Sequence, residues 1–213
     1  SKGGAEELGY LRGGYGLLFE KLEKGLADRG VRIFKGAPVE AILKEDNHVS
    51  GVRVNGENVD CSHVIACTQL PDYLNVAGEA IGQQASPLKE IGFLGNATLV
   101  LRLNKRLSDT YWVNITDPDC PFVGVIEQTN LLDESHYDGN HLAYISRYMD
   151  VEDSLYGMDA EELFGIYYPW LCKVFPAFSK DWIEELMLWR DPYSQAVVSV
   201  GYNEKIPTQR TSV

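Results

Sequence analysis

The hydrophobic pattern of the first third of the chain begins with a single amphipathic helix. Leu18, Leu22 and Leu26 recur every four residues, so they fall on one face of a helix. The stripe predicts a helix over residues 14–29. Gly30 directly after it can adopt the left-handed conformation that terminates helices.

Short extended runs follow this helix. Asn55-Gly56 lies between apolar alternating residues and is the strongest hairpin signal in the chain, because both residues tolerate positive φ. The run at 63–67 is apolar without alternation, which is typical of a strand that is covered on both faces. The extended segments predicted here are residues 31–34, 39–44, 52–54 and 63–67.

Beyond about residue 85 the segments become longer and alternate between apolar and polar positions, which predicts an antiparallel sheet. Asp159 and Glu162 have the spacing of a capping box and open an apolar run to Phe175, in which Pro169 predicts a kink or a restart. The predicted strands are residues 98–103, 111–115, 122–128, 141–148, 185–189 and 196–200.

These two patterns predict an α+β (mixed α/β) protein with a boundary near residue 80. Residues 1–80 would hold a helix, strands and a hairpin, and residues 81–213 an antiparallel or mixed sheet with helices on one face. The 213 residues suffice for one large domain or two small ones.

Composition narrows the classes of partner. Nineteen basic and 31 acidic side chains give a formal charge of −12, and no basic run is present that could follow a phosphate backbone. We therefore expect no nucleic-acid partner. No apolar stretch approaches the roughly 18 residues of a membrane span, so we expect no stable membrane insertion and a cytoplasmic location.

The cysteine and histidine spacings do not predict a metal site. No C-x-x-C pair occurs among the four cysteines, so we expect buried thiols in a reducing compartment. No two histidines have the i, i+4 spacing of a helical metal site. Gly13-Gly14-Tyr15-Gly16 precedes a helix, as phosphate-binding loops do, but it lacks a preceding strand and the G-x-G-x-x-G spacing.

Aromatic and charged residues gather at predicted strand positions in the second part. Large rings with polar tips suit the wall of a ligand cavity, but the same residues could equally fill a core or pair on the surface. The residues in question are Tyr111, Trp112, Glu127, Tyr144, Arg147, Tyr148, Trp189, Arg190 and Tyr193.

Three segments of the first part, LGYLRGGYGLLFEKLEKGL (8–26), GVRIFKGAPVEAI (30–42) and VSGVRVNGENVDCSHVIACTQLP (49–71), resemble the superfamily of flavin-dependent amine oxidases, protoporphyrinogen oxidases and phytoene desaturases. Relatives similar to UDP-galactopyranose mutase belong to the same group. The resemblance implies that residues 1–80 are the second segment of an FAD-binding domain. It places the main chain of Val39 at the adenine edge, and Thr68 and Gln69 close to the cofactor.

The later segments resemble the substrate-binding domain of this group, which implies a hydride transfer from a small organic substrate to FAD. For contact with that substrate we name Trp112, Glu127, Arg147, Tyr148, Arg190 and Tyr193, with Arg147 or Arg190 pairing an anionic group. Whether the substrate is an amine, an isoprenoid, a porphyrin-like ring or a sugar nucleotide stays open.

The G-x-G-x-x-G unit of the family is missing from this sequence. Because that unit holds the cofactor pyrophosphate, we expect an internal fragment that binds FAD weakly or not at all, is inactive alone and self-associates through exposed apolar surface. One alternative is a free-standing α+β binding module without redox activity. Another is a mutase-type, non-redox flavoenzyme acting on a nucleotide sugar.

Overall fold

The computed structural model describes residues 9–206, which divide into two compact units. Within these residues, the large unit comprises 9–31 and Leu94–Ser194, and the small unit comprises Arg32–Phe93 and 195–206. We predicted one boundary near residue 80, whereas the units change at 31/32, 93/94 and 194/195. The shift from residue 80 to residue 93 arises because residues 81–93 pack with the helix that precedes them, as described below.

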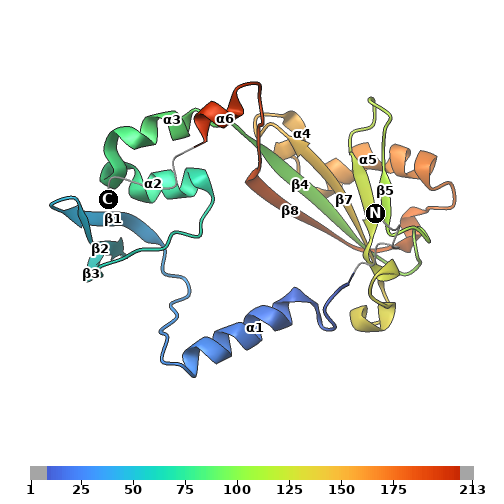
Figure 1. Cartoon of the computed structure of the whole chain (residues 1–213). Helices are drawn as coiled ribbons and strands as arrows, with labels where there is room; N and C mark the ends of the chain where they lie inside the picture. The colour runs from blue at the N-terminus through green and yellow to red at the C-terminus, as the bar shows by residue number, and fades with distance from the viewer. Residues whose placement is uncertain (1–8, 207–213) are drawn as a thin grey trace, which may run out of the picture. The chain divides into compact units, whose positions relative to one another are not determined.

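Helix α1 (Gly14–Ala27) confirms the first predicted helix (Figure 1). It ends in a Schellman motif: the amide of Val31 donates to the carbonyl of Leu26 at 3.1 Å, and that of Gly30 donates to Ala27 at 2.9 Å. Gly30 has φ 83°, as expected of its position. None of the helix residues is buried.

The small unit is built on a three-stranded antiparallel sheet in the order β1-β2-β3. The strands are β1 (Val39–Glu45), β2 (His48–Val54) and β3 (Glu57–Asp60). The predicted turn at Asn55-Gly56 joins β2 to β3, with φ of 51° and 76°. A second two-residue turn, Asp46-Asn47, joins β1 to β2, and both of its residues have positive φ.

Helices pack together in the rest of the small unit. Helices α2 (Leu70–Ile81) and α3 (Ala85–Lys89) flank the 3-10 turn η1 (Gly82–Gln84). Their core consists of Ile81, Ala85, Leu88 and Ile91, with Phe93, Ala196 and Tyr202 packed around it. Helix α6 (Tyr202–Lys205) carries the last of these residues.

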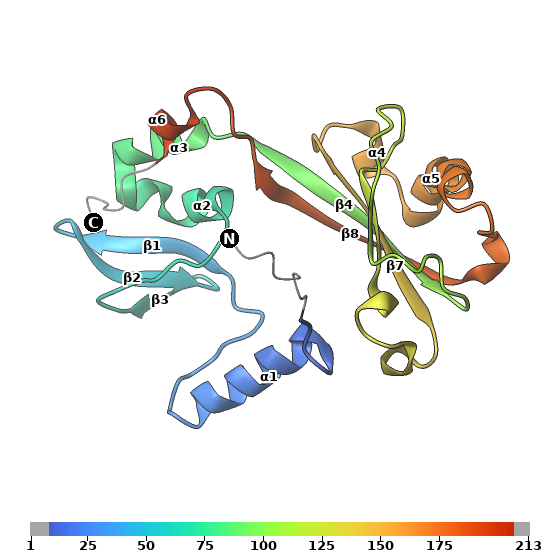
Figure 2. The same cartoon turned by 45° about the vertical axis from the view of Figure 1, so that its right-hand side comes forward.

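The large unit contains a five-stranded sheet in the order β5-β6-β7-β4-β8, which confirms the predicted antiparallel sheet. Figure 2 labels three of its strands, β4, β7 and β8. Its strands are β4 (Phe93–Leu103), β5 (Trp112–Asn114), β6 (Gly124–Glu127), β7 (His141–Met149) and β8 (Ile183–Ala196). Short helices connect them: η2 (Gln128–Asn130), η3 (Glu134–Tyr137), α4 (Ser154–Gly157) and η4 (Lys180–Trp182).

Helix α5 (Ala160–Val174) packs on one face of this sheet. Its Leu163, Tyr167 and Leu171 are fully buried among residues such as Leu99 and Ile145 of the central strands. Asp159 forms the predicted capping box with Glu162. The helix continues through Pro169, so the predicted restart is wrong. Pro169 and Gly165 are both exposed, so water can reach the carbonyl that lacks a partner amide.

Several predicted strands are absent or shorter in the described residues. The segments 31–34 and 63–67 form no ladder, and Ile65 is 89% exposed. A strand requires a neighbour for its amide groups, which the pattern of one segment cannot guarantee. Strand β8 ends at Ala196, so the predicted run 196–200 is also not a strand. The overall α+β class is confirmed.

The cysteines are all free, and Cys67 is exposed, contrary to the expected burial. Within residues 9–206 no helix is long and apolar enough to cross a bilayer.

Candidate functional site

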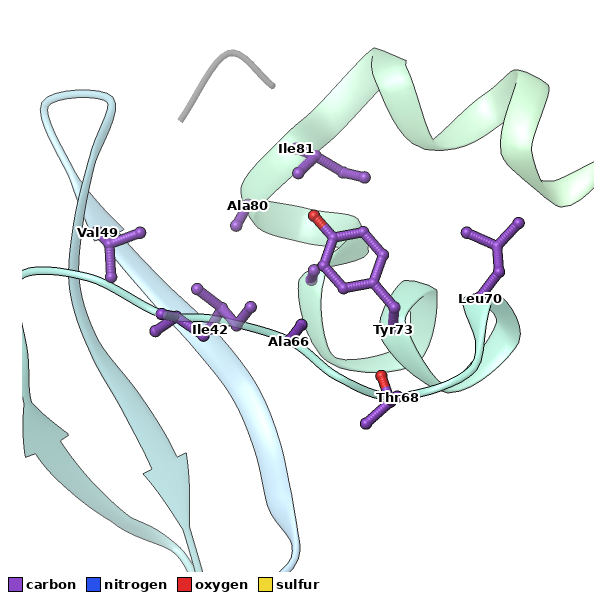
Figure 3. A pocket seen from close by; sticks show the side chains of 10 residues that line it. Ile42, Val49, Ala66, Thr68, Leu70, Tyr73, Ala80 and Ile81 are labelled. Carbon is purple, nitrogen blue, oxygen red and sulfur yellow. The ribbon is translucent and has the colours of Figure 1, made fainter. Parts of the chain in front are cut away.

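A cavity of about 470 Å³ lies in the small unit, between the sheet and helix α2 (Figure 3). Its walls are mainly aliphatic, and the polar atoms among its lining side chains are the hydroxyls of Thr68 and Tyr73. The lining residues are Ile42, Val49, Val64, Ala66, Thr68, Leu70, Tyr73, Ala77, Ala80 and Ile81. Such a cavity suits a flat, mostly apolar group with one or two hydrogen-bonding atoms.

The predicted cofactor residues lie around this small unit. Thr68 lines the cavity and precedes α2, and Gln69 is the N-cap residue of that helix. Val39 begins β1, is 42% exposed and lies three residues before Ile42, which is in the cavity wall. Val39 and Gln69 are not part of the lining.

Strand β1 is an edge strand, because its one neighbour in the described sheet is β2. Alternate main-chain amides and carbonyls of an edge strand point away from the ladder and can bind a heteroaromatic edge. Together with the apolar cavity and the Thr68 hydroxyl, this geometry fits part of a nucleotide cofactor. The negative charge of Asp72, in the first turn of α2, would repel a phosphate at the N-terminal end of that helix.

The second candidate region is the face of the five-stranded sheet that points away from α5. We call it the outer face. Because partners in an antiparallel ladder share a face, the registers assign its residues directly. On β4 to β7 they are Asn96, Thr98, Val100, Arg102, Trp112, Asn114, Gly124, Ile126, Leu142, Tyr144, Ser146 and Tyr148.

Three polar side chains form a hydrogen-bonded strip on the outer face. The amide of Asn96 donates to Ser146 Oγ at 2.8 Å, and the Thr98 hydroxyl donates to Asn96 Oδ1 at 2.6 Å. Thr98 Oγ1 also lies 3.3 Å from Ser146 Oγ. Sequence reasoning missed this strip, because Ser146 meets the other two only through the pairing of β4 with β7.

Aromatic residues flank the strip. Trp112 is 55% exposed, and its indole N–H donates to Asn114 Oδ1 at 2.8 Å. Tyr148 is 46% exposed and pairs directly with Asn96. The outer face therefore brings together two of the six predicted substrate residues, Trp112 and Tyr148.

Tyr144 belongs to the outer face and to a cluster of tyrosines. Burial raises the pKa of its hydroxyl, and the neighbouring Tyr137, Tyr10 and Tyr111 act in the same direction. Tyr144 is paired with Val100 of β4 and with Ile126 of β6. The cluster extends the aromatic surface around the polar strip.

The two predicted arginines lie elsewhere. Arg147 alternates with Tyr148 and reaches the α5 side, where it donates to the Pro121 carbonyl at 3.0 Å and lies 3.9 Å from Asp153. Arg190 donates to the carbonyl of Met158, and its guanidinium carbon lies 5.8 Å from the centroid of the Tyr156 ring. The two guanidinium groups are thus held by different carbonyls.

Glu127 is fully buried on the same side of the sheet as α5. Its carboxylate accepts from the Leu107 amide at 3.0 Å and from the Thr129 hydroxyl, which in turn lies 3.0 Å from His141 Nδ1. Through these contacts the Glu127 carboxylate connects the 104–110 loop to η2, so its role is structural. Tyr193 of β8 is half-buried, and its amide donates to Asp191 at 3.0 Å.

Comparisons with known proteins agree with the fold. The model of the family described as flavin containing amine oxidoreductase matches residues 1–211. The 4,4'-diapolycopen-4-al dehydrogenase of Metabacillus indicus is 31% identical over 80 residues, which are 38% of this chain and 16% of that protein.

Two solved structures show the likeness in three dimensions. An oxidoreductase from Methanosarcina mazei has a TM-score of 0.69 at 18% identity, over 94% of this chain and 47% of its own. Reduced UDP-galactopyranose mutase has a TM-score of 0.70 at 13% identity, over 91% of this chain and 42% of its own. The chain spans less than half the length of each, and at these identities the likeness shows the fold.

Proposed function

Because the chain belongs to the family of flavin-containing amine oxidoreductases, we propose that it provides cofactor contacts and the substrate-binding sheet of an FAD-dependent oxidoreductase. When bound, FAD supplies the acceptor for a hydride from an organic substrate. The residues of this chain hold the cofactor, orient the substrate and exclude water from both.

The observation that carries the proposal is the cavity lined by Thr68 beside the edge strand that begins at Val39. The main chain of Val39 would bind a heteroaromatic edge of the cofactor. Thr68 would contribute a hydroxyl and Gln69 a side-chain amide near the start of α2. None of these three residues carries a charge, so the phosphates would be held by other parts of the enzyme.

On the substrate side, Trp112 and Tyr148 of the outer face remain our candidates for contact, and Tyr193 stays a prediction. Glu127, Arg147 and Arg190 have partners within the large unit, and we assign them to the support of the sheet. Among the predicted residues, no arginine is therefore proposed to pair with the substrate.

Titration with FAD tests this proposal. FAD is added to this chain and to the product of the complete reading frame that contains it, and flavin absorbance and fluorescence are followed. We expect the complete protein to bind FAD and its Thr68→Val variant to bind three- to tenfold more weakly, since one hydrogen bond is lost. The matched control is Thr110→Val, an exposed threonine of the large unit.

A complete protein that does not respond to FAD would contradict the proposal and favour a binding module without redox activity. Equal FAD affinity in the wild type and in Thr68→Val would remove Thr68 from the cofactor site.

A further inference from the structure

On strands β4 to β7 the outer face is nearly devoid of charge. Among its paired positions on β4 to β7, Arg102 alone is ionised, and its Nε lies 3.1 Å from Glu185 Oε2 of β8. We call residues that are paired across the strands a row. The ion pair lies in the row of Arg102 and Leu142, and the row of Val100 and Tyr144 separates it from that of Thr98 and Ser146. On these four strands a charged ligand group placed on the polar strip would therefore lose its hydration without finding a free opposite charge.

The polar strip has hydrogen-bonding capacity left over. Asn96 uses one of its two amide hydrogens on Ser146, and Thr98 uses its single hydroxyl hydrogen on Asn96. Within residues 9–206, the second amide hydrogen of Asn96 and the hydroxyl hydrogen of Ser146 are consequently available, although the latter can also turn toward Thr98. These groups are donors, which match a carbonyl, ether or hydroxyl oxygen.

The surroundings of the strip are apolar and aromatic. Tyr148 lies beside Asn96, while Tyr144 and Ile126 occupy the next row of the ladder from Ser146 and Gly124. Trp112 closes that row at β5. Rings of this kind bind the apolar body of a ligand through area burial and stacking.

From this combination we propose that the outer face binds an uncharged, mostly apolar ligand through one carbonyl or hydroxyl oxygen placed on Asn96 and Ser146. The inference rests on the proposed function, in which this face carries the substrate. It selects an alcohol, an aldehyde or a ketone over an ammonium group, a carboxylate or a phosphate. The selectivity comes from the donors and from the lack of a free opposite charge on β4 to β7.

The test uses three probes that share one ring system: 2-naphthalenemethanol, 2-naphthoate and 2-naphthalenemethylamine. Their binding to this chain is measured by saturation-transfer NMR without flavin, so a failure of FAD binding does not affect the result. We expect the alcohol to bind at least tenfold more tightly than either ion. Equal affinities, or a preference for one of the ions, would overturn the proposal.

Two variants locate the site. Ser146→Ala removes a donor and should weaken binding of the alcohol three- to tenfold while leaving the weak binding of naphthoate unchanged. Ser86→Ala, an exposed serine of α3 in the small unit, is the matched control and should change neither. An unchanged affinity of Ser146→Ala for the alcohol would remove the strip from the site.

A third variant reverses the selectivity. Tyr148 is 46% exposed, so Tyr148→Lys should fold and place an ammonium group beside Asn96. Naphthoate should then bind more tightly than 2-naphthalenemethylamine. If the order of these two ions does not respond to the added lysine, the ligand lies elsewhere and the proposal is wrong.

Discussion

The phenol hydroxyl of Tyr167 is buried without a hydrogen-bond partner in the described residues. The ring itself packs well, with its centroid 5.1 Å from that of Phe122. A buried polar group without a partner opposes folding, because it loses its water and gains nothing. Tyr167→Phe should therefore raise the free energy of unfolding, by up to about 1 kcal/mol, in urea denaturation at pH 7. A decrease of 1 kcal/mol or more would mean that the hydroxyl has a partner.

The same residue makes stability sensitive to alkaline pH. Burial raises the pKa of Tyr167 to about 12, from the ordinary 10.0 that holds in the unfolded chain. Between these two values the folded protein keeps a proton that the unfolded chain releases, so stability decreases as pH rises through that window. We expect urea midpoints of the wild type to fall from pH 10 to pH 12, and those of Tyr167→Phe to fall less. Parallel curves would contradict the assignment.

Asp117 makes the stability of the protein sensitive to acidic pH. Its carboxylate accepts from Lys173 Nζ at 3.0 Å, and this hydrogen bond, followed by that from the Asp119 amide, lowers its pKa below the ordinary 3.8. A lowered pKa contributes stability above the unfolded value and loses it as pH falls through the folded value. Because the pair is exposed, the effect is small.

Asp117→Asn should accordingly lower the melting temperature slightly at neutral pH. The difference should disappear at acidic pH, where the carboxyl is protonated in both states. Asp119→Asn is the control, since it removes a neighbouring carboxylate and keeps the ion pair between Asp117 and Lys173. A difference between wild type and Asp117→Asn that persists unchanged into acid would rule out the ionised carboxylate as its source.

At the scale of elements, local signals predicted the turns and caps whose chemistry lies within a few residues. Asn55-Gly56 and the Asp159–Glu162 box are both confirmed. The turn at Asp46-Asn47 also has two positive φ values, but it contains no glycine. Because the sequence signal for such a turn is strongest with glycine, this turn was not predicted. The polar strip could not be predicted either, since Asn96 and Ser146 are 50 residues apart and meet through strand pairing.

The close pairing of β2 with β3 requires a glycine at position 51, which the sequence alone did not predict. A Cβ at this position would lie 2.6 Å from the carbonyl oxygen of Val59 on β3, and a ladder carbonyl cannot move aside. Gly51→Ala should destabilise the small unit by about 1–3 kcal/mol. Gly78→Ala in α2 has open space and should stabilise it by about 0.5–1 kcal/mol. Amide exchange in β2 and α2 measures both, and a Gly51→Ala protein as stable as wild type would contradict the close approach.

At the scale of the whole molecule, many large apolar side chains remain exposed. Leu17, Leu18, Phe19 and Leu22 of α1 are 38–65% exposed, and Ile65 is 89% exposed. Exposed apolar groups in such number favour association. We expect this chain to self-associate at micromolar concentration or above, measured by size exclusion with light scattering. A mass that stays at 23.8 kDa over that range would contradict this expectation.

The two units differ in the size of their cores, and this predicts how the chain unfolds. The large unit buries leucines 99, 101 and 103 with the α5 residues, whereas the small unit has a core of four buried residues and a cavity. Buried apolar area is the main source of stability, so the small unit should unfold first. All four tryptophans, at 112, 170, 182 and 189, belong to the large unit, whereas far-UV circular dichroism detects both units.

In urea at low protein concentration, the loss of circular dichroism should therefore begin before the change in tryptophan fluorescence. Gly78→Ala should move the early circular-dichroism phase to higher urea and leave the fluorescence midpoint unchanged, because only the small unit is stabilised. Coincident curves for both probes would show that the two units unfold as one cooperative structure. In that case the small unit, with the Thr68 cavity, would owe its stability to the rest of the chain, and FAD binding there would stabilise the outer face as well.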